Sequence, residues 1–420
     1  MGAQSYNDVV ATQIEAVMPL LTGFFDNEDA LFSTFEKIPA KTQSGRNMRM
    51  PIELRPGGKT RAVDLDNGSL GTGSGPVYDY TAMSPVDAVH AISWSLKSKF
   101  TTDSNDKAVV DTVQRTIASG IKEAKIKVDK HLQGAGTGVL ASISDATSAP
   151  TFTVKGTNFG ARLLRFGDDV AVYHHDQSAY YGVLTVAAID YQAGTVTLSA
   201  SAIGGHSLVA TDVLCVAGLT ATPPTWTYGL PYHHNNAATG TWLGWNRANY
   251  PEVRTPWVDG GSSNLTVETV QKLLAYIDGE LGEDVFDSGK WLWYFNPKQH
   301  FQLVSQMQTI SEITLPMGGG GNGQVDLAFS RKRQRVLCDM PIKTSINADP
   351  GRVDLIDVKN WMRGTYKELE FLKLGGSTVL PVPNGTSYDA TEISYLTWSQ
   401  QFACRNPRRA GYISNLRIPL

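Results

Sequence analysis

The longest uninterrupted helical pattern in the chain runs from Thr101 to Gln133. The apolar residues that recur along it every three or four positions are Val110, Val113, Ile117, Ile121, Ala124, Val128 and Leu132. This spacing places one apolar stripe on an α-helix, and Gly134 ends the pattern. At about 1.5 Å per residue, a helix over 105–133 is roughly 43 Å long. The pattern therefore predicts a strut along which other parts of the chain pack.

Gly120 lies in the middle of this predicted helix. A glycine inside a helix costs about 1 kcal/mol relative to alanine, because its backbone loses more conformational freedom on folding. Its presence predicts one of two arrangements. Either a neighbouring element packs closely against the helix at this point, or the helix bends there.

The composition indicates a globular chain with few charges. It has 420 residues, of which 41% are hydrophobic and 18% charged, and its net charge is −3. A chain of this length predicts two to three domains. The charge balance excludes a strong general attraction to nucleic acid or to anionic membranes. The 40 glycines and 20 prolines indicate many turns and extended segments.

The cysteines and the apolar runs indicate a soluble protein of a reducing compartment. Cys215, Cys338 and Cys404 lie far apart without CxxC spacing, so we expect free thiols and neither disulfides nor structural zinc. The N-terminal residues carry no signal-peptide pattern. The most apolar run, Trp291–Phe295, is too short to span a membrane and predicts a buried strand.

An N-terminal arm and a long extended excursion are predicted before the main helix. Helical patterns in 5–21 and Asp26–Lys37 predict the arm, over 1–41. The next segment, Thr42–Tyr80, is polar and rich in glycine. Two extended limbs of about 15 residues each, at roughly 3.3 Å per residue, reach about 50 Å. Because an isolated two-stranded ribbon is marginal in water, we expect this excursion to lie on another molecule; the alternative is a flexible surface loop.

Three further segments flank the main helix. Ala88–Phe100 alternates apolar and polar residues and predicts a half-buried strand leading into the helix. Gly134–Gly138 predicts a hinge after it. These glycines follow a helix, whereas a phosphate-binding loop precedes one, so we do not expect phosphate binding. Phe152–Val216 contains short β-rich runs with turn signals between them, which predicts a small inserted β-barrel.

The second half of the chain predicts a mixed α+β domain. Its expected elements are a helix over Leu265–Leu281, a buried strand over Trp291–Phe295, a helix beginning at Pro297, strands over Gln334–Leu337 and Arg352–Val358, and an alternating strand over Ile393–Cys404. Four consecutive glycines, Gly318–Gly321, predict a loop that becomes ordered only with a partner.

Two clusters have the residue types of binding or catalytic sites. The metal-ligand types occur in His174, His175 and Asp176, and in His233, His234 and Asn235. Adjacent histidines in a strand point to opposite faces, so we expect surface turn histidines and no metal site. The Trp-rich segment Pro223–Gly260, with Trp226, Trp242, Trp245 and Trp257, offers a sugar platform with the carboxylates Glu252 and Asp259. Aromatic residues buried at a domain junction are the favoured interpretation.

One basic run stands out, and no catalytic motif does. The run consists of Arg331, Lys332, Arg333 and Arg335. It suits contact with a polyanion, or with an acidic edge of a neighbouring molecule formed by Glu280, Glu283, Asp284 and Asp287. The sequence has no Ser-His-Asp spacing, nucleophile elbow, phosphate loop or dinucleotide fingerprint. We therefore expect no catalytic residues, no cofactor and no metal, and no enzyme activity.

The order of these parts resembles the Hong Kong 97-type major capsid protein of tailed double-stranded DNA phages. The stretches that carry the resemblance are GAGTGVLASI after the long helix, YPEVRTPWVDGG before LTVETVQKLLAYI, WLWYFNPKQHFQLV, and the closing FACRNPRRAGYISNL. The resemblance implies an α+β fold with the following segments: N-terminal arm 1–41, extended loop 42–87, peripheral domain 88–145 with a spine helix over 105–133, inserted β-barrel-like domain 146–218, axial domain 219–360, return to the peripheral domain 361–404, and C-terminal strand 405–420.

The resemblance also implies a function and partners. The chain is then expected to assemble as pentamers and hexamers into the icosahedral shell of a virion, after synthesis in the host cytoplasm. The implied partners are further copies of the chain, a separate scaffolding protein, a portal, possible decoration proteins and weakly held double-stranded DNA, with no membrane. Covalent cross-linking through Lys59 is not expected. The competing hypothesis is a carbohydrate-binding or carbohydrate-active protein that uses the Trp-rich segment 223–260.

Overall fold

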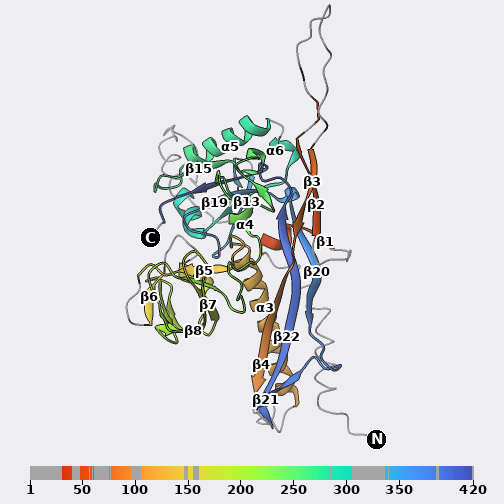
Figure 1. The fold of residues 1–420 in the computed structure, drawn as a ribbon, viewed down its shortest axis with the longest axis vertical. Coiled ribbons are helices and arrows are strands. Elements are labelled where there is room, and N and C mark those ends of the chain that lie inside the picture. The colour runs from red at the N-terminus through yellow and green to blue at the C-terminus, as the bar shows by residue number, and fades with distance from the viewer. Residues whose placement is uncertain are drawn as a thin grey trace, which may run out of the picture.

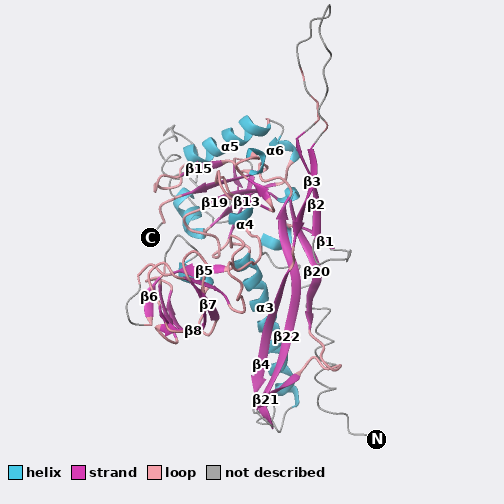
Figure 2. Ribbon diagram, in the orientation of Figure 1, coloured by secondary structure: helices cyan, strands magenta, loops and turns pink. Residues whose placement is uncertain are grey.

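A 26-residue helix, α3 (Asp106–His131), lies beside a long, mainly antiparallel sheet, and the two run along the length of the molecule (Figure 1). An α/β body lies at one end of this pair, and a small β-barrel lies beside α3 (Figure 2). The structure is a computed structural model of the 420-residue chain. It describes residues 31–39, 48–55, 57, 58, 60, 75, 77–95, 106–145, 150–154, 160–282, 285–304, 336–338, 340–384 and 387–418.

The long sheet has five strands and is built around β22 (Ser387–Cys404). Its other strands are β1 (Glu36–Pro39), β4 (Val86–Ser95), β20 (Trp361–Phe371) and β21 (Leu380–Asn384). β4 pairs along one edge of β22, β20 and β21 share the other edge, and β1 lies parallel to β20. The predicted strand over Ile393–Cys404 is confirmed and begins earlier than expected.

The apolar stripe of α3 packs against one face of the long sheet, where it contacts β4. The buried residues at this contact are Ile117, Ile121, Ala124 and Val128 of the helix and Ala88, Ile92 and Trp94 of the strand. A Cβ atom on Gly120 would lie 2.4 Å from Cδ1 and 2.6 Å from Cγ1 of Ile92. The glycine therefore makes room for the strand, so the first alternative predicted for Gly120, close packing by a neighbour, is confirmed.

This contact predicts how Gly120→Ala changes the stability of the protein. Whether the change is a loss or a gain depends on the side chain at Ile92. We expect Gly120→Ala to destabilise the protein by about 1–3 kcal/mol, because the added methyl group overpacks a buried contact. In an Ile92→Ala background the same change should stabilise by up to about 1 kcal/mol, because only the better helix propensity of alanine remains. Chemical unfolding of the four proteins of this double-mutant cycle measures the difference. An effect of equal sign in both backgrounds would show that Gly120 does not face Ile92.

The N-terminal segment differs from the sequence prediction. The helix expected over Asp26–Lys37 is wrong in its described part, where a 3₁₀ helix, η1 (Leu31–Thr34), leads into β1. The reason is tertiary packing, because Leu31, Phe32 and Phe35 are all buried in the core between α3 and the long sheet. The helix expected over 5–21 lies outside the described residues.

Two strands form the base of the predicted extended excursion. β2 (Met48–Arg55) pairs antiparallel with β3 (Val77–Met83), in a register that places Met48 opposite Met83. The side chains of Met50 and Met83 are buried in a cluster with Trp242. The pairing confirms a two-stranded element whose base is anchored in its own chain. Most of the residues between the strands, Lys59 included, lie outside the described part.

The barrel consists of six short strands in one sheet. In spatial order they are β5 (Val139–Ser142), β12 (Val213–Val216), β7 (Asp169–Tyr173), β8 (Tyr180–Asp190), β9 (Thr195–Leu198) and β6 (Thr151–Thr153). The sheet closes on itself because Ile143, after β5, pairs with Val154, after β6. Two additions are the hairpin of β10 (Ala202–Ile203) with β11 (His206–Ser207) and the 3₁₀ helix η2 (Gly160–Leu163). β5 joins this sheet although it precedes the expected start of the insertion at residue 146.

The α/β body is built on a second six-stranded sheet. In spatial order its strands are β15 (Trp257–Asp259), β23 (Ala410–Ser414), β19 (Val353–Asp357), β16 (Trp291–Phe295), β18 (Met340–Thr344) and β17 (Val336–Leu337). Its helices are α5 (Val267–Leu281), α6 (Val285–Ser288) and a helix over 297–304. Thr266 caps α5 by accepting a hydrogen bond from the N–H of Thr269. The predicted helices and buried strand are confirmed here.

Short elements connect the body to the long sheet. They are α4 (Leu230–His233), β13 (Thr241–Trp242), β14 (Trp245–Asn246), η3 (Pro251–Val253) and η4 (Val358–Asn360). The basic run 331–335 and the glycines 318–321 lie outside the described residues. Among the helices that the structure does describe, none combines the length and the apolar character needed to cross a membrane.

Candidate functional site

The C-terminal turns of α3 meet the N-terminal segment and the α/β body at Asp129. Its carboxylate accepts hydrogen bonds from the backbone N–H of Leu31 (3.4 Å), from Nδ2 of Asn347 (2.9 Å) and from Oγ of Ser345 (3.4 Å). Burial raises the pKa of Asp129, and these hydrogen bonds oppose that shift. One buried acid therefore joins α3 to two segments that are distant in sequence.

The next turn of α3 extends the connection to the barrel. Nζ of Lys130 donates a hydrogen bond to the backbone oxygen of Leu163 in η2 (2.9 Å). Burial lowers the pKa of Lys130 to about 8. Gln133 Nε2 donates to the hydroxyl of Tyr294 in β16 (2.9 Å). The end of the long helix is thus bonded to the barrel on one side and to the body on the other.

Ion pairs add a second attachment between α3 and the barrel. Lys127 lies 3.2 Å from the Asp168 carboxylate, and Arg165 lies 3.7 Å from that of Glu123. Partly exposed pairs of this kind contribute about 1 kcal/mol or less each. They orient the barrel against the helix more than they stabilise it.

Gly229 allows the chain after the barrel to return to the end of α3. The N–H of Leu230 donates to the backbone oxygen of Leu132 (2.8 Å), and the N–H of Gly229 donates to that of Gly134 (3.1 Å). A Cβ atom at Gly229 would lie 2.1 Å from the oxygen of Leu132. Because that obstacle is backbone and not a flexible side chain, only glycine fits there.

Trp361 lies where the long sheet, the N-terminal segment and α4 converge. Its side chain is fully buried. The indole stacks on the ring of Phe35 with a centroid distance of 5.0 Å and an interplanar angle of 17°. The rings of His233 and His234 meet it edge-on at 5.0 and 5.3 Å. Trp361 is therefore the aromatic centre of a contact among three segments, and Asp129, His233, His234 and Trp361 are called the central junction below.

His233 has no ring nitrogen available for a metal ion. Its Nδ1 lies 3.0 Å from Nε1 of Trp242, which can only donate. Nδ1 therefore carries the lone pair, and Nε2 carries the proton that it donates to the oxygen of Phe402 (3.2 Å). Burial lowers the pKa of His233 to about 3, so the ring is neutral at neutral pH. The expectation that His233 and His234 are surface turn histidines was wrong, because both side chains are fully buried.

His234 belongs to a buried charged cluster. Its Nδ1 lies 2.9 Å from Oδ1 of Asp354, and Arg352 holds the same carboxylate with Nε and Nη2 at 2.7–3.0 Å. Burial alone would raise the pKa of Asp354, but Arg352 and the hydrogen bonds outweigh it and lower that pKa to about 2. Burial also lowers the pKa of His234. The cluster is an ionised Asp354–Arg352 pair that positions a neutral histidine beside Trp361.

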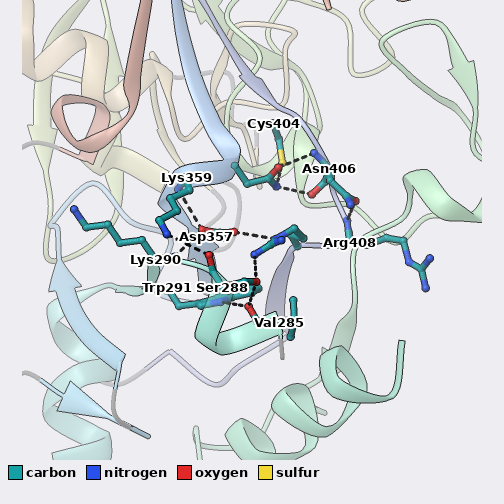
Figure 3. Close-up of polar contacts among 11 residues, drawn as sticks. Val285, Ser288, Lys290, Trp291, Asp357, Lys359, Cys404, Asn406 and Arg408 are labelled. Carbon is teal, nitrogen blue, oxygen red and sulfur yellow. Dashed lines mark hydrogen bonds and ion pairs between the residues drawn. The ribbon is translucent and has the colours of Figure 1, made fainter. Parts of the chain in front are cut away.

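Asp357, at the end of β19, anchors a second set of contacts between the body and the long sheet (Figure 3). Its Oδ1 accepts hydrogen bonds from the N–H groups of Lys290 (3.0 Å) and Lys359 (3.2 Å). Its Oδ2 accepts from Nε of Arg409 (3.0 Å), whose Nη2 donates to Oγ of Ser288 (2.9 Å). This buried carboxylate therefore ties α6, β16 and the β22–β23 turn together.

The β22–β23 turn is itself held on both sides. Asn360 Nδ2 donates to the oxygen of Asn406 (2.6 Å), and the N–H of Asn406 donates to Oδ1 of Asn360 (2.9 Å). Arg408 donates to the side chain of Glu280 (3.3 Å) and to its backbone oxygen (3.0 Å). Glu280, one of the acids considered as an alternative partner for a basic run of another molecule, is thus paired within its own chain.

The Trp-rich segment serves the core of this region. Trp242 is fully buried, and Trp257, half-buried, donates from Nε1 to Oγ of Ser414 (2.7 Å). Asp259 Oδ1 accepts from the N–H of Gly261 (2.9 Å) and from Nδ2 of Asn415 (3.0 Å). A sugar platform needs an exposed ring face beside carboxylates, and this arrangement does not favour one. The interpretation as buried aromatics at a junction is confirmed for Trp242.

His174, His175 and Asp176 come together in the turn between β7 and β8. The assignment of the two histidines to a strand was wrong, because β7 ends at Tyr173; the expectation of surface turn histidines is confirmed. Nδ1 of His174 lies 2.7 Å from Oδ1 of Asp176, and Nε2 of His174 lies 3.1 Å from Nδ1 of His175. The structure therefore brings together side chains that the sequence argument separated.

Four buried residues that join the parts of the molecule were not predicted from the sequence. Asp129, Asp354, Asp357 and Trp361 were not singled out. A signal existed for Asp129, because it directly follows Val128 of the buried stripe. A second signal lay in the predicted strand Arg352–Val358, where Asp354 and Asp357 stand among apolar residues. Acids buried in such a strand need hydrogen-bond or charge partners. Nothing in the pattern around Trp361 distinguished it from other core aromatics.

The chain is similar in fold to a chain of one solved phage capsid, and weaker similarities to other capsid chains are found. It aligns with a chain of the cyanophage A-1(L) capsid asymmetric unit with a TM-score of 0.56 and 11% identity, over 91% of each chain. A capsid chain of the native GTA particle gives a TM-score of 0.44 and 9% identity, over 92% of this chain and 89% of that chain. A chain from Gordonia phage Cozz gives a TM-score of 0.45 and 9% identity, over 92% of this chain and 86% of that chain. No family model and no curated protein sequence matches the chain.

The first of these matches establishes the fold. It covers nearly all of both chains, so the similarity is not restricted to one domain. An identity of 11% relates the two chains by fold alone.

Proposed function

We propose that this chain is the major capsid protein of a tailed double-stranded DNA phage, with the Hong Kong 97-type fold. Its role is to form pentamers and hexamers, with closed cyclic symmetry, that join into an icosahedral shell around the genome. The observation that carries the proposal is the match in fold to the cyanophage A-1(L) capsid chain over 91% of both chains. The chain would then act in the virion after synthesis in the host cytoplasm.

The parts of the molecule suit this role. We assign α3 as the spine helix and the sheet around β22 as the peripheral domain. The body built on β16 and β19 becomes the axial domain, 219–360, and the β2–β3 ribbon becomes the base of the extended loop, 42–87. Residues 1–41 become the N-terminal arm, the barrel becomes the insertion, and 405–420 the closing strand. The elongated arrangement in Figure 1 supports the assignment, because a wedge-shaped subunit needs contacts at both ends.

The proposed role is structural and not catalytic. Asp129, His233 and His234 of the central junction make buried side-chain hydrogen bonds to other segments, and Asp357 does the same. Paired groups of this kind fix the relative positions of α3, the long sheet and the body. A subunit of a closed shell needs that rigidity, because its contacts at one end set the angle of its contacts at the other.

Assembly under this proposal uses the β2–β3 ribbon. Met50 and Met83 anchor its base to the subunit's own core, and we assign the contact with a neighbouring subunit to the residues between the two strands. Each contact buries apolar surface only when that neighbour binds. The burial then contributes about 25 cal/mol of binding free energy per Å². Specificity then comes from many moderate contacts repeated over the shell.

We further propose the partners that such a shell requires. They are a separate scaffolding protein and a portal, with decoration proteins as possible additions. Packaged DNA is expected to make weak, non-specific contact, because the net charge of the chain is −3 and tight DNA binding needs many Lys or Arg contacts to phosphates.

Electron microscopy of the purified full-length protein tests the proposal. We expect rings or closed icosahedral particles, alone or with a scaffolding protein co-expressed. Monomers that remain monomers at high concentration, in every salt condition and with scaffolding protein, would overturn it. A glycan array run on the same preparation tests the carbohydrate hypothesis, for which we expect no specific binding.

A further inference from the structure

The exposed turn between β7 and β8 holds an arrangement that core packing does not require. Three residues of this turn, His174, His175 and Asp176, place their nitrogen and oxygen atoms within 4.8 Å of one another. They form the one group of three or more such side chains in the part of the chain that the structure describes. Their side chains are half-buried or exposed, so a dissolved ion reaches them.

Asp176 determines which nitrogen of His174 carries the proton. The carboxylate accepts a hydrogen bond from Nδ1 of His174 at 2.7 Å, so that nitrogen carries the hydrogen. The N–H and the Oγ of Ser178 donate to the same Oδ1 atom, at 2.9 and 2.5 Å. The carboxylate is thereby fixed in place. In the neutral ring this leaves the lone pair of His174 on Nε2, directed away from Asp176.

The lone pair of His174 points to a second imidazole. Nδ1 of His175 lies 3.1 Å from Nε2 of His174, and the ring centroids are 4.1 Å apart at an angle of 56°. A metal ion bound to both nitrogens at about 2.0–2.1 Å would subtend an angle of roughly 100°. That angle lies between the square and tetrahedral values, so the pair needs little movement to chelate. Before binding, the shared hydrogen belongs to Nδ1 of His175; when the ion takes its place, the neutral ring of His175 carries its proton on Nε2 instead, so both ligating nitrogens present lone pairs.

We propose that His174 Nε2 and His175 Nδ1 form a binding site for a borderline divalent transition-metal ion such as Zn²⁺, Cu²⁺ or Ni²⁺. Imidazole ligands favour these ions, whereas Ca²⁺ and Mg²⁺ favour oxygen. Asp176 is a positioning residue, because a carboxylate that accepts the other N–H of a ligating histidine fixes its orientation and raises its basicity. Water fills the remaining coordination positions. The site goes beyond the proposed shell function and does not depend on it.

The other histidines of the barrel and the junction provide a contrast. His206 is the remaining barrel histidine; its Nε2 lies 2.8 Å from Asp212, and its ring stacks on Tyr181 at 3.6 Å. His233 has both nitrogens in hydrogen bonds within the core. Among the described residues, neither belongs to a group of three side chains of metal-ligand type. His206 therefore serves as the matched control, as a surface histidine that is paired with an acid but lies outside the proposed site.

Titration of the full-length protein with CuSO₄ and with ZnCl₂ tests the proposal. By calorimetry we expect each chain to bind one metal ion tightly. The electron paramagnetic resonance spectrum of the Cu²⁺ complex should show two imidazole nitrogen ligands. His174→Ala and His175→Ala should each lower the association constant at least about tenfold, whereas His206→Ala should leave it unchanged. Asp176→Asn should weaken binding about 10–100-fold while the spectrum still reports two nitrogens.

Three results would overturn the site. The first is a wild-type spectrum with fewer than two nitrogen ligands, which needs no variant and so cannot be confused with misfolding. The second is binding that survives both His174→Ala and His175→Ala in variants whose circular dichroism is that of the wild type. The third is an equal loss of binding in His206→Ala. Calcium chloride serves as the negative control, for which no binding is expected at this turn.

Discussion

Removal of residues 64–75 is expected to leave a folded chain that builds no shells. The deletion shortens the outer part of the extended loop but spares the paired strands β2 and β3. It also spares Met50 and Met83, which anchor those strands to the core around Trp242. Folding should therefore be unaffected, whereas a contact that reaches a neighbouring subunit would be lost. Circular dichroism and thermal unfolding measure the first expectation, and light scattering with electron microscopy measures the second.

A matched control separates the length of this loop from its sequence. Replacing residues 64–75 with a Gly-Ser segment of the same length keeps the reach but removes the side chains. If the side chains make the contact, this variant should also fail to assemble; if reach alone matters, it should form shells. Shells of normal size from the deletion itself would remove the assignment of 42–87 as an intersubunit loop, while the fold would stand.

The long helix and the buried strands could be predicted because their signal is local. The spacing of Ile117, Ile121 and Val128 has one period, and α3 uses that face against the sheet. Trp291–Phe295 is apolar throughout and forms β16 at the centre of the body. The glycine at position 120 gave two alternatives, and only its contact with Ile92 decided between them. That contact depends on β4, which is held in the long sheet by pairing with β22.

The remaining features depend on contacts that no local pattern encodes. Leu31, Phe32 and Phe35 have a helical spacing, but burial under the long sheet places the first two in a 3₁₀ helix and Phe35 between that helix and β1. His174 and His175 looked like strand residues because β7 precedes them directly, and only the position at which that strand ends brings their nitrogens together. The junction around Trp361 combines residues from the beginning, middle and end of the chain. Its existence follows from topology and not from any single stretch.

Trp361→Ala is expected to cost about 3–5 kcal/mol of stability, the range for removing a large buried aromatic side chain. The indole is fully buried, and its removal takes away the stacking partner of Phe35 and the surface against which His233 packs. The cavity would lie between the sheet, α4 and the N-terminal segment. Chemical unfolding measures the loss, and hydrogen exchange over residues 31–39 should rise, because the stack of Phe35 on Trp361 directly precedes β1, which pairs with β20.

Trp257→Ala is the matched control, because it removes the same side chain from a different environment. Trp257 is half-buried and makes one side-chain hydrogen bond, to Ser414, so less apolar surface returns to water and we expect less than half the loss of Trp361→Ala. It should also leave hydrogen exchange over 31–39 unchanged. If both variants lost equal stability, Trp361 would be an ordinary core residue. If only Trp361→Ala loosened 31–39, the N-terminal segment would be held by the same aromatic contact that joins the sheet to the body. Loss of that contact would then reduce shell assembly even where the folded subunit survives.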